Sequence, residues 1–177
     1  NAFTYPDRTV YPCSRRNAKD FQNLMRVYCD AVFFPALTED HFRQEGHHLE
    51  FTADGKLMTN GVVYNEMRGV YSDADGILDR HMQQQLFDSN AYGTDYGGDP
   101  KAIPELTYKQ FIDFHRAYYH PSNSWIFTYG NVDLTETLAV LDKEYLAKFD
   151  AIELDSTIAP LSPWFQPQQG RFTYPLD

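Results

Sequence analysis

Two kinds of hydrophobic pattern alternate along this chain, and this alternation restricts its fold more than any other feature. Residues 1–14 are rich in Tyr, Phe, Thr and Val around a Pro-Asp turn, which predicts a hairpin of two short strands. Residues 18–33 carry apolar side chains at helical spacing, and Asn17 precedes them as an N-cap. Two further strand-like runs flank Asp54-Gly55, a dipeptide typical of type I′ hairpins.

The same alternation continues through the rest of the chain. The predicted elements are a helical turn at 38–44, a helix over 61–72 that resumes at 74–87, an irregular loop over 88–104, a helix over 107–120, a buried strand over 124–132 and a helix over 133–149. Such an order predicts an α+β fold with helices packed on one face of a mostly antiparallel sheet. From residue 151 the chain is rich in Pro and Gln. We therefore expect one domain over 1–150 and a linker over 151–177.

Charge and composition exclude several classes of protein. The chain has 177 residues, a net charge of −10 and a pI near 4.9, which argue against a nucleic-acid partner and fit a basic or peptide-like partner better. It has no run of 18 apolar residues, so we expect no membrane partner. Cys13 and Cys29 are too few for a disulfide framework and have no metal-binding spacing, which favours reduced cysteines.

One carboxylate falls inside an apolar helical stripe. At about 100° per residue, Glu66 lies between Val62 and Val70, and Val63 and Met67 extend the stripe. Because an unpaired charge there would be costly to remove from water, we expect a metal ion, a cationic side chain or a polar network beside Glu66. Spacing alone favours an ion-paired structural glutamate over a metal ligand.

The histidines form no recognisable metal motif. His115 lies on the apolar side of its helix, and we expect a core histidine that is hydrogen-bonded through one ring nitrogen. His47 and His48 are consecutive in a strand and would point to opposite faces, so they cannot bind one ion together. The sequence contains no HExxH, HxxEH, GxSxG, Walker A or dinucleotide-binding motif.

A series of short segments nevertheless resembles the presequence-protease branch of the pitrilysin/insulinase metallopeptidases. In order, these segments are NAFTYPDRTVYP, DAVFFP, GVVYNEMRGVYS, YGTDYGGDP and FHRAYYHPSN. The resemblance runs from Asn1 to about Asp150. It implies a partial pitrilysin-type (inverzincin) domain of the N-terminal, metallopeptidase kind over 1–150, and a linker toward a following domain over 151–177.

The resemblance also implies a role for Glu66. Members of that family bind Zn²⁺ through two histidines of an HxxEH motif and a glutamate on a following helix. Glu66 matches that third ligand. The resemblance therefore favours a metal ligand, whereas spacing alone favours an ion-paired structural glutamate. The implied protein is a zinc metalloendopeptidase for short unfolded or targeting peptides. Its HxxEH motif would lie in a segment before Asn1, so we expect no catalytic residue within this chain and no activity from the chain alone.

Two kinds of partner follow from the same resemblance. Asn1, Ala2, Phe3 and Thr4 match the segment that binds substrate peptides as an added strand at a sheet edge, although the residues alone indicate only an edge strand. The missing N- and C-terminal parts of the same protein are the other expected partners. The resemblance leaves a bacterial cytoplasm and a mitochondrial or plastid matrix as expected compartments.

Two other functions fit the same residues. One is a non-catalytic homologue that serves as a peptide-holding or assembly domain. The other is a self-standing binding domain in which Glu66 pairs with Arg or Lys. A change of Glu66 to Gln would then alter stability without affecting peptide cleavage.

Overall fold

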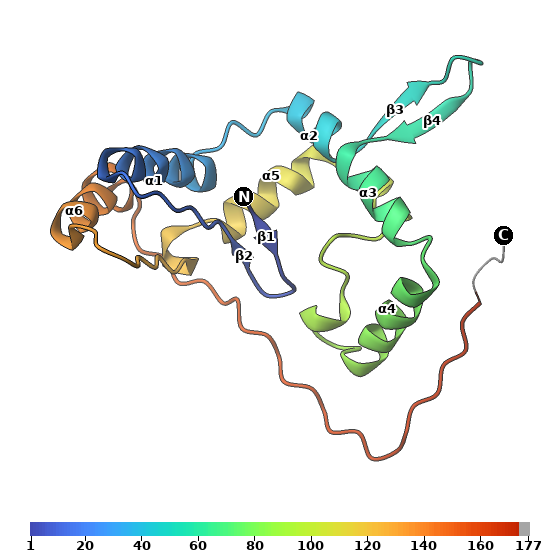
Figure 1. Cartoon of the computed structure of the whole chain (residues 1–177). Coiled ribbons are helices and arrows are strands. Elements are labelled where there is room, and N and C mark those ends of the chain that lie inside the picture. Colours follow the sequence, from blue (N-terminus) through green and yellow to red (C-terminus); the bar gives the residue numbers. More distant parts are fainter. Residues whose placement is uncertain (174–177) are drawn as a thin grey trace. The chain divides into compact units, whose positions relative to one another are not determined.

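Helices alternate with short strand pairs in the computed structural model, which describes residues 1–173 (Figure 1). The helices of this part are α1 (Ala18–Phe33), α2 (Glu39–Glu45), α3 (Val62–Val70), α4 (Ala74–Leu86), α5 (Tyr108–Tyr118) and α6 (Leu134–Glu144). The strands are β1 (Phe3–Thr4), β2 (Thr9–Val10), β3 (His48–Phe51) and β4 (Leu57–Asn60). Short 3-10 helices are η1 (Ala91–Gly93), η2 (Ile103–Glu105), η3 (Pro121–Asn123) and η4 (Leu146–Lys148). Strand β1 pairs with β2, and β3 pairs with β4, so the α+β class and the antiparallel pairing are confirmed.

Side-chain caps fix the starts of four helices. The capping oxygens belong to Asn17, Thr38, Asp73 and Asp133, which accept hydrogen bonds from the amides of Asp20, His41, Gly76 and Glu136 over 2.8 to 3.2 Å. Each bond satisfies an amide that has no partner within its own helix. The helix start that the sequence predicts at 18 is confirmed, and the helix predicted from 133 starts at Leu134 with Asp133 as its cap.

The hairpin of β3 and β4 forms where the sequence predicts it, but its turn is of another type. Thr52 donates its amide to the carbonyl of Lys56 at 2.8 Å, and the amide of Gly55 donates to Thr52 at 2.9 Å. Gly55 has φ +80°, whereas no described residue other than glycine has a positive φ. A type I′ turn needs positive φ at Asp54 as well, so the prediction of type I′ is wrong. The three-residue loop places only its glycine in the left-handed region.

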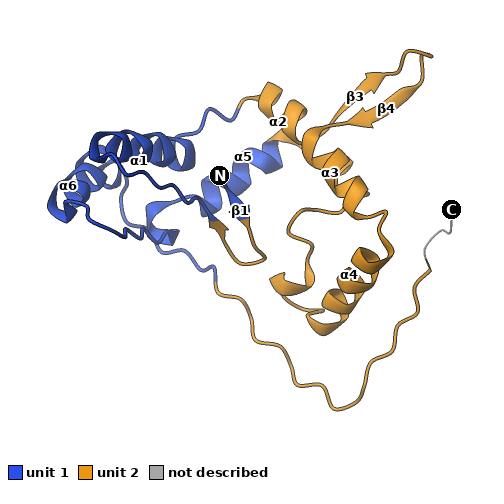
Figure 2. Cartoon of the chain, viewed as in Figure 1, with its two compact units in different colours: residues 1–3, 10–37, 109–156 blue, residues 4–9, 38–108, 157–177 orange. Residues whose placement is uncertain are grey.

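The chain divides into two compact units, shown in Figure 2. Unit 1 contains residues 1–3, 10–37 and 109–156, and unit 2 contains residues 4–9, 38–108 and the described residues from 157 onward. From Ala151 to Thr173 the chain has no helix or strand. The domain boundary at residue 150 stays a prediction.

The core of unit 1 lies between α1 and α6. Met25 and Phe33 of α1 are buried with Leu141 of α6 and with Tyr145, the residue that ends α6. Thr137 is fully buried, and its hydroxyl oxygen accepts a hydrogen bond from the Gln22 side-chain amide at 3.2 Å. The apolar face predicted for 18–33 thus packs through Met25, whereas α6 packs through Leu141 and leaves Leu134 and Leu138 exposed.

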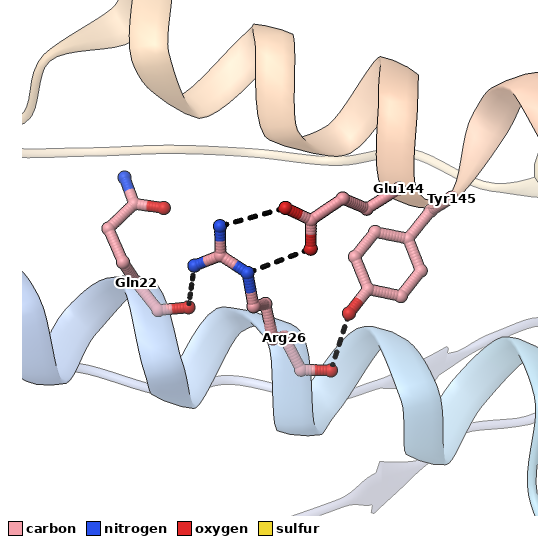
Figure 3. A network of polar contacts seen from close by, with 4 residues as sticks. All are labelled: Gln22, Arg26, Glu144 and Tyr145. Atoms are coloured by element: carbon pink, nitrogen blue, oxygen red, sulfur yellow. Dashed lines mark hydrogen bonds and ion pairs between the residues drawn. The ribbon is translucent and has the colours of Figure 1, made fainter.

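A polar network borders this core (Figure 3). The guanidinium of Arg26 donates to both carboxylate oxygens of Glu144, at 2.8 and 2.9 Å, and to the carbonyl of Gln22 at 3.3 Å. The hydroxyl of Tyr145 donates to the carbonyl of Arg26 at 3.1 Å. Arg26 lowers the pKa of the Glu144 carboxyl, chiefly through these hydrogen bonds, and burial raises the pKa of Tyr145 to about 12.

His115 is half-buried, and the predicted hydrogen bond through one ring nitrogen is confirmed. Its Nε2 donates to the carbonyl oxygen of Val32 at 3.0 Å, and its ring stacks on that of Tyr119 with centroids 4.6 Å apart. One ring nitrogen thus joins α5 to the end of α1 within unit 1.

The strand predicted over 124–132 is wrong. Residues 124–129 have no regular secondary structure, and Trp125, Phe127 and Tyr129 are exposed. A strand forms only when another backbone segment pairs with it, and none of the described residues does so here.

Leu141→Ala should destabilise the protein by about 2 to 5 kcal/mol, because it leaves a cavity where α6 packs on α1. Denaturant unfolding measures this change. Leu141 is 3% exposed, whereas Leu138 on the same helix is 55% exposed, so Leu138→Ala is the matched control and should cost far less. Equal losses in the two variants would contradict the assignment of this core.

The contribution of Glu144 to stability should depend on pH. Since its folded-state pKa is lowered, the contribution is present above the unfolded-state value of about 4.3 and is lost as the pH falls through the folded value. The native protein should therefore lose more stability between about pH 5 and pH 3 than Glu144→Gln does. Unfolding followed over this range tests the difference. Equal losses in the native protein and in Glu144→Gln would contradict a role for this ion pair.

Candidate functional site

Glycine 61 determines how α3 follows the β3–β4 hairpin in unit 2. Gly61 has φ +153°, a backbone conformation that side chains rarely adopt. A Cβ atom there would lie 2.2 Å from the carbonyl oxygen of Gly46, and the amide of Tyr64 donates to this same oxygen at 3.4 Å. Close approach of two glycine backbones therefore sets the start of the helix that carries Glu66.

Met67 anchors α3 to the glycine-rich loop that contains Gly97. It is 7% exposed, and a Cβ atom at Gly97 would lie 2.5 Å from its sulfur. Gly97 donates its amide to the side chain of Asp95 at 3.0 Å, which holds the glycine-rich loop against the methionine. The loop that the sequence predicts as irregular is thus the surface on which α3 packs.

The positively charged side chain of Arg80, on α4, supports this loop. The guanidinium of Arg80 bonds the carboxylate of Asp95 at 3.2 Å and lies over the ring of Tyr71, 3.1 Å from its centroid. Burial, followed by the charge of Asp95, raises the pKa of the Tyr71 hydroxyl. Sequence analysis missed this cluster, because Arg80 and Asp95 have no periodic relation that would signal a contact.

Glu66 lies on the exposed side of α3, and this position corrects the expectation of a buried stripe. Val62, Val63 and Val70, which share that side with it, are exposed as well. Glu66 has no hydrogen-bond or ion-pair partner among the described residues, so the ion pair favoured by spacing alone does not form here. Of the residues in the predicted stripe, Met67 alone is buried, so α3 packs through that one member.

The described residues contain no group of three or more His, Cys, Asp and Glu side chains that could hold a metal ion. A zinc site needs three or four protein ligands. Glu66 suits one ligand position, because its carboxylate is free and accessible. The Nε2 of His47 donates to the carbonyl of Leu106 at 2.9 Å.

Of the four predicted substrate-binding residues, Phe3 and Thr4 form the short strand β1, and Asn1 and Ala2 precede it. Asn1, Ala2, Phe3 and Thr4 are all exposed, and β1 pairs only with β2 in the described part of the chain. The other edge of β1 has free backbone groups, as strand addition requires. Residues 1–3 belong to unit 1, whereas Thr4 and Glu66 belong to unit 2.

Comparisons with known proteins show which family the chain resembles. Residues 105–175 match the family model described as the peptidase M16 inactive domain. The chain is 47% identical to Protein HypA of Clostridium perfringens and 46% identical to the mitochondrial presequence protease of Danio rerio, over 98% and 95% of its own length. It is 54% identical to presequence protease 1, chloroplastic/mitochondrial, of Arabidopsis thaliana over 85% of its length. Residues 105–175 are therefore similar to the peptidase M16 family, and these relatives are similar to most of the chain.

The M16 match covers only part of such proteins. The chain spans 18% of the Clostridium protein, 17% of the Danio protein and 14% of the Arabidopsis protein. The match to the family model extends across the domain boundary predicted at residue 150. Glu66 lies before residue 105, where this match begins. No helix in the described part of the chain has the length and apolar character needed to cross a membrane.

Glu66→Gln should change the free energy of unfolding by less than about 0.5 kcal/mol, because the carboxylate is exposed and unpaired. Met67→Ala, one residue further along α3, should cost about 2 kcal/mol or more, since it empties the contact with Gly97. Thermal or denaturant unfolding of the two variants measures both changes. A large loss in Glu66→Gln would support a structural ion pair instead.

Proposed function

We propose that the full-length protein containing this chain is a zinc metalloendopeptidase that hydrolyses short unfolded or targeting peptides. The observation that carries the proposal is the 41–54% identity to proteins named presequence protease. These names apply to much longer proteins, so the activity is proposed for the whole protein and not for residues 1–177 alone.

Glu66 is proposed as one ligand of the metal ion. Its free carboxylate on an exposed side of α3 supports this role, because a ligand must be unprotonated and unpaired before the ion binds. When bound, Zn²⁺ would lower the pKa of a water molecule and so supply the nucleophile for peptide hydrolysis. Within this chain, Gly61 and Met67 orient α3 and thereby Glu66.

The chain alone is proposed to be inactive. One carboxylate cannot hold zinc with useful affinity, and a hydrolytic site also needs a base. The other ligands and the base would come from an HxxEH motif in a segment before Asn1, so the sequence of that segment is a direct test. The further partners are then the remaining parts of the same polypeptide.

Peptide substrates are proposed to bind as an added strand along Asn1–Thr4. The open edge of β1 supports this mode, because main-chain hydrogen bonds accept many peptide sequences. A net charge of −10 favours basic targeting peptides among them. The names of the relatives support a mitochondrial, plastid or bacterial interior as the compartment.

A non-catalytic homologue that holds peptides or serves in assembly is the second candidate. The description of the matched model as an inactive domain favours it. That match begins at residue 105, however, and so leaves out α3 and Glu66. Absence of HxxEH from the full-length protein, or absence of stoichiometric zinc, would favour this second function.

Glu66→Gln in the full-length protein should lower kcat/KM for an unstructured basic peptide by at least about 100-fold. Loss of an outer-shell partner of a metal typically costs 10- to 100-fold, and loss of a ligand should cost no less. Zinc content should fall in parallel, and a chelator should abolish the native activity. Peptide cleavage assays and metal analysis measure these effects.

Glu105→Gln is the matched control, because it removes an exposed carboxylate elsewhere in unit 2. Its activity and zinc content should equal those of the native protein. Full activity and full zinc content in Glu66→Gln would remove this residue from the metal site.

A further inference from the structure

Helix α3 has few contacts of its own that could fix its orientation. It is nine residues long, and isolated helices shorter than about 12 residues are marginal in water. In the described part of the chain, no side chain caps its first turn, and Met67 is its one buried residue. The close approach of Gly61 to Gly46 sets its start, so other residues must hold its far end.

One arginine contacts that far end. Tyr71 ends α3, and its amide donates to the carbonyl of Met67 at 2.9 Å. The guanidinium of Arg80 lies over the ring of Tyr71, with its central carbon 3.1 Å from the ring centroid. A cation over the face of an aromatic ring is attracted by the negative charge of that face. Arg80, on α4, therefore holds the last turn of α3 directly.

The same arginine reaches α3 by a second route, through Asp95. Its Nε donates to one carboxylate oxygen of Asp95 at 3.2 Å, and the amide of Gly97 donates to the other oxygen at 3.0 Å. Gly97 lies against the sulfur of Met67, since a Cβ atom on the glycine would be only 2.5 Å from it. Arg80 thus acts on the residue next to Glu66 as well as on the end of the helix.

Little water reaches this ion pair. The side chains of Arg80 and Asp95 are 10% and 19% exposed, whereas those of Arg43 and Glu39, which pair on α2, are 62% and 54% exposed. An exposed ion pair contributes little to stability, but breaking a covered one leaves a charge without a partner. The contact of Arg80 with Asp95 is therefore hard to break, and this suits it to holding a helix in one orientation.

We propose that Arg80 is a positioning residue of the metal site, which fixes the rotation of α3 and thereby the direction of the Glu66 carboxylate. This inference rests on the proposed role of Glu66 as a metal ligand. Ligand distances in metal sites are set to within about 0.2 Å, so a small rotation of the helix is enough to weaken binding. Arg80 needs no contact with the ion, because it acts through Tyr71 and Asp95.

The double contact requires arginine. A guanidinium is planar and can stack on a ring while its N–H groups bind a carboxylate. Lysine has the same charge, but its ammonium group is a point charge on a flexible stem. Arg80→Lys should therefore keep a positive charge beside Asp95 and lose the contact with the ring of Tyr71. This variant separates the positioning of the helix from the balance of charge.

Zinc release from the full-length protein tests the proposal. The native protein and the variants are loaded with zinc, and transfer of the ion to a chromogenic chelator is followed well below each melting temperature. Arg80→Gln and Arg80→Lys should both release zinc at least about 10-fold faster than the native protein, as loss of a residue that orients a ligand does in other metal sites. The zinc-free forms of both variants should also show faster amide exchange in α3.

Arg43→Gln is the matched control. It also removes a cation from an ion pair of unit 2, but this pair is exposed and lies on α2. Its zinc release and its amide exchange in α3 should equal those of the native protein.

Two results would overturn the inference and leave the proposed function intact. Native release rates in both Arg80 variants would show that Arg80 does not position the ligand. Equally fast release from Arg43→Gln would assign the effect to net charge. A native full-length protein without zinc would instead defeat the proposed function, and the inference with it. If Arg80→Gln does not fold, the release rate of Arg80→Lys decides.

Discussion

The contact between α1 and α6 is the interaction on which unit 1 depends. Tyr145 fills the space between the helices with its ring, and its hydroxyl donates to the backbone of α1 at Arg26. Arg26 then binds Glu144, the last residue of α6, so the same turn of α1 is held through its backbone and its side chain. Since α5 is joined to α1 through His115, this pair of helices also fixes the position from which residues 124–129 extend.

Unit 2 is organised around fewer buried side chains. Met67 and Ile103 are buried, and both contact the glycine-rich loop, where Gly97 and Gly98 leave room for them. Arg80 holds the loop through Asp95. The consequence is that α3 is fixed along one side only. Its other side, which carries Glu66, remains accessible, and this is the arrangement that a ligand position needs.

The elements set by local chemistry could be predicted from the sequence, and those set by distant partners could not. Asn17 and Asp133 cap helices because their side chains reach amides three residues ahead, so short-range pattern suffices. The sequence predicts the position of the turn at Asp54 but not its type, because both turn types place glycine in the left-handed region. Residues 124–132 have the composition of a strand, but pairing depends on a backbone that their own sequence does not contain.

The sequence could place Glu66 on an apolar face of its helix, because that depends on local pattern. It could not show whether this face is buried, because burial depends on distant partners. Periodicity gives the angle of a side chain around its helix, whereas burial depends on what packs there. Of the predicted stripe, only Met67 is buried here. Another part of the full-length protein that covers Val62 and Val70 would also remove water from the Glu66 carboxylate between them. A buried carboxylate is costly without a cation beside it, so the covering part must bring one. An apolar face with one free carboxylate therefore favours a partner that brings compensating positive charge with it, and a metal ion held by that partner's own side chains meets this requirement.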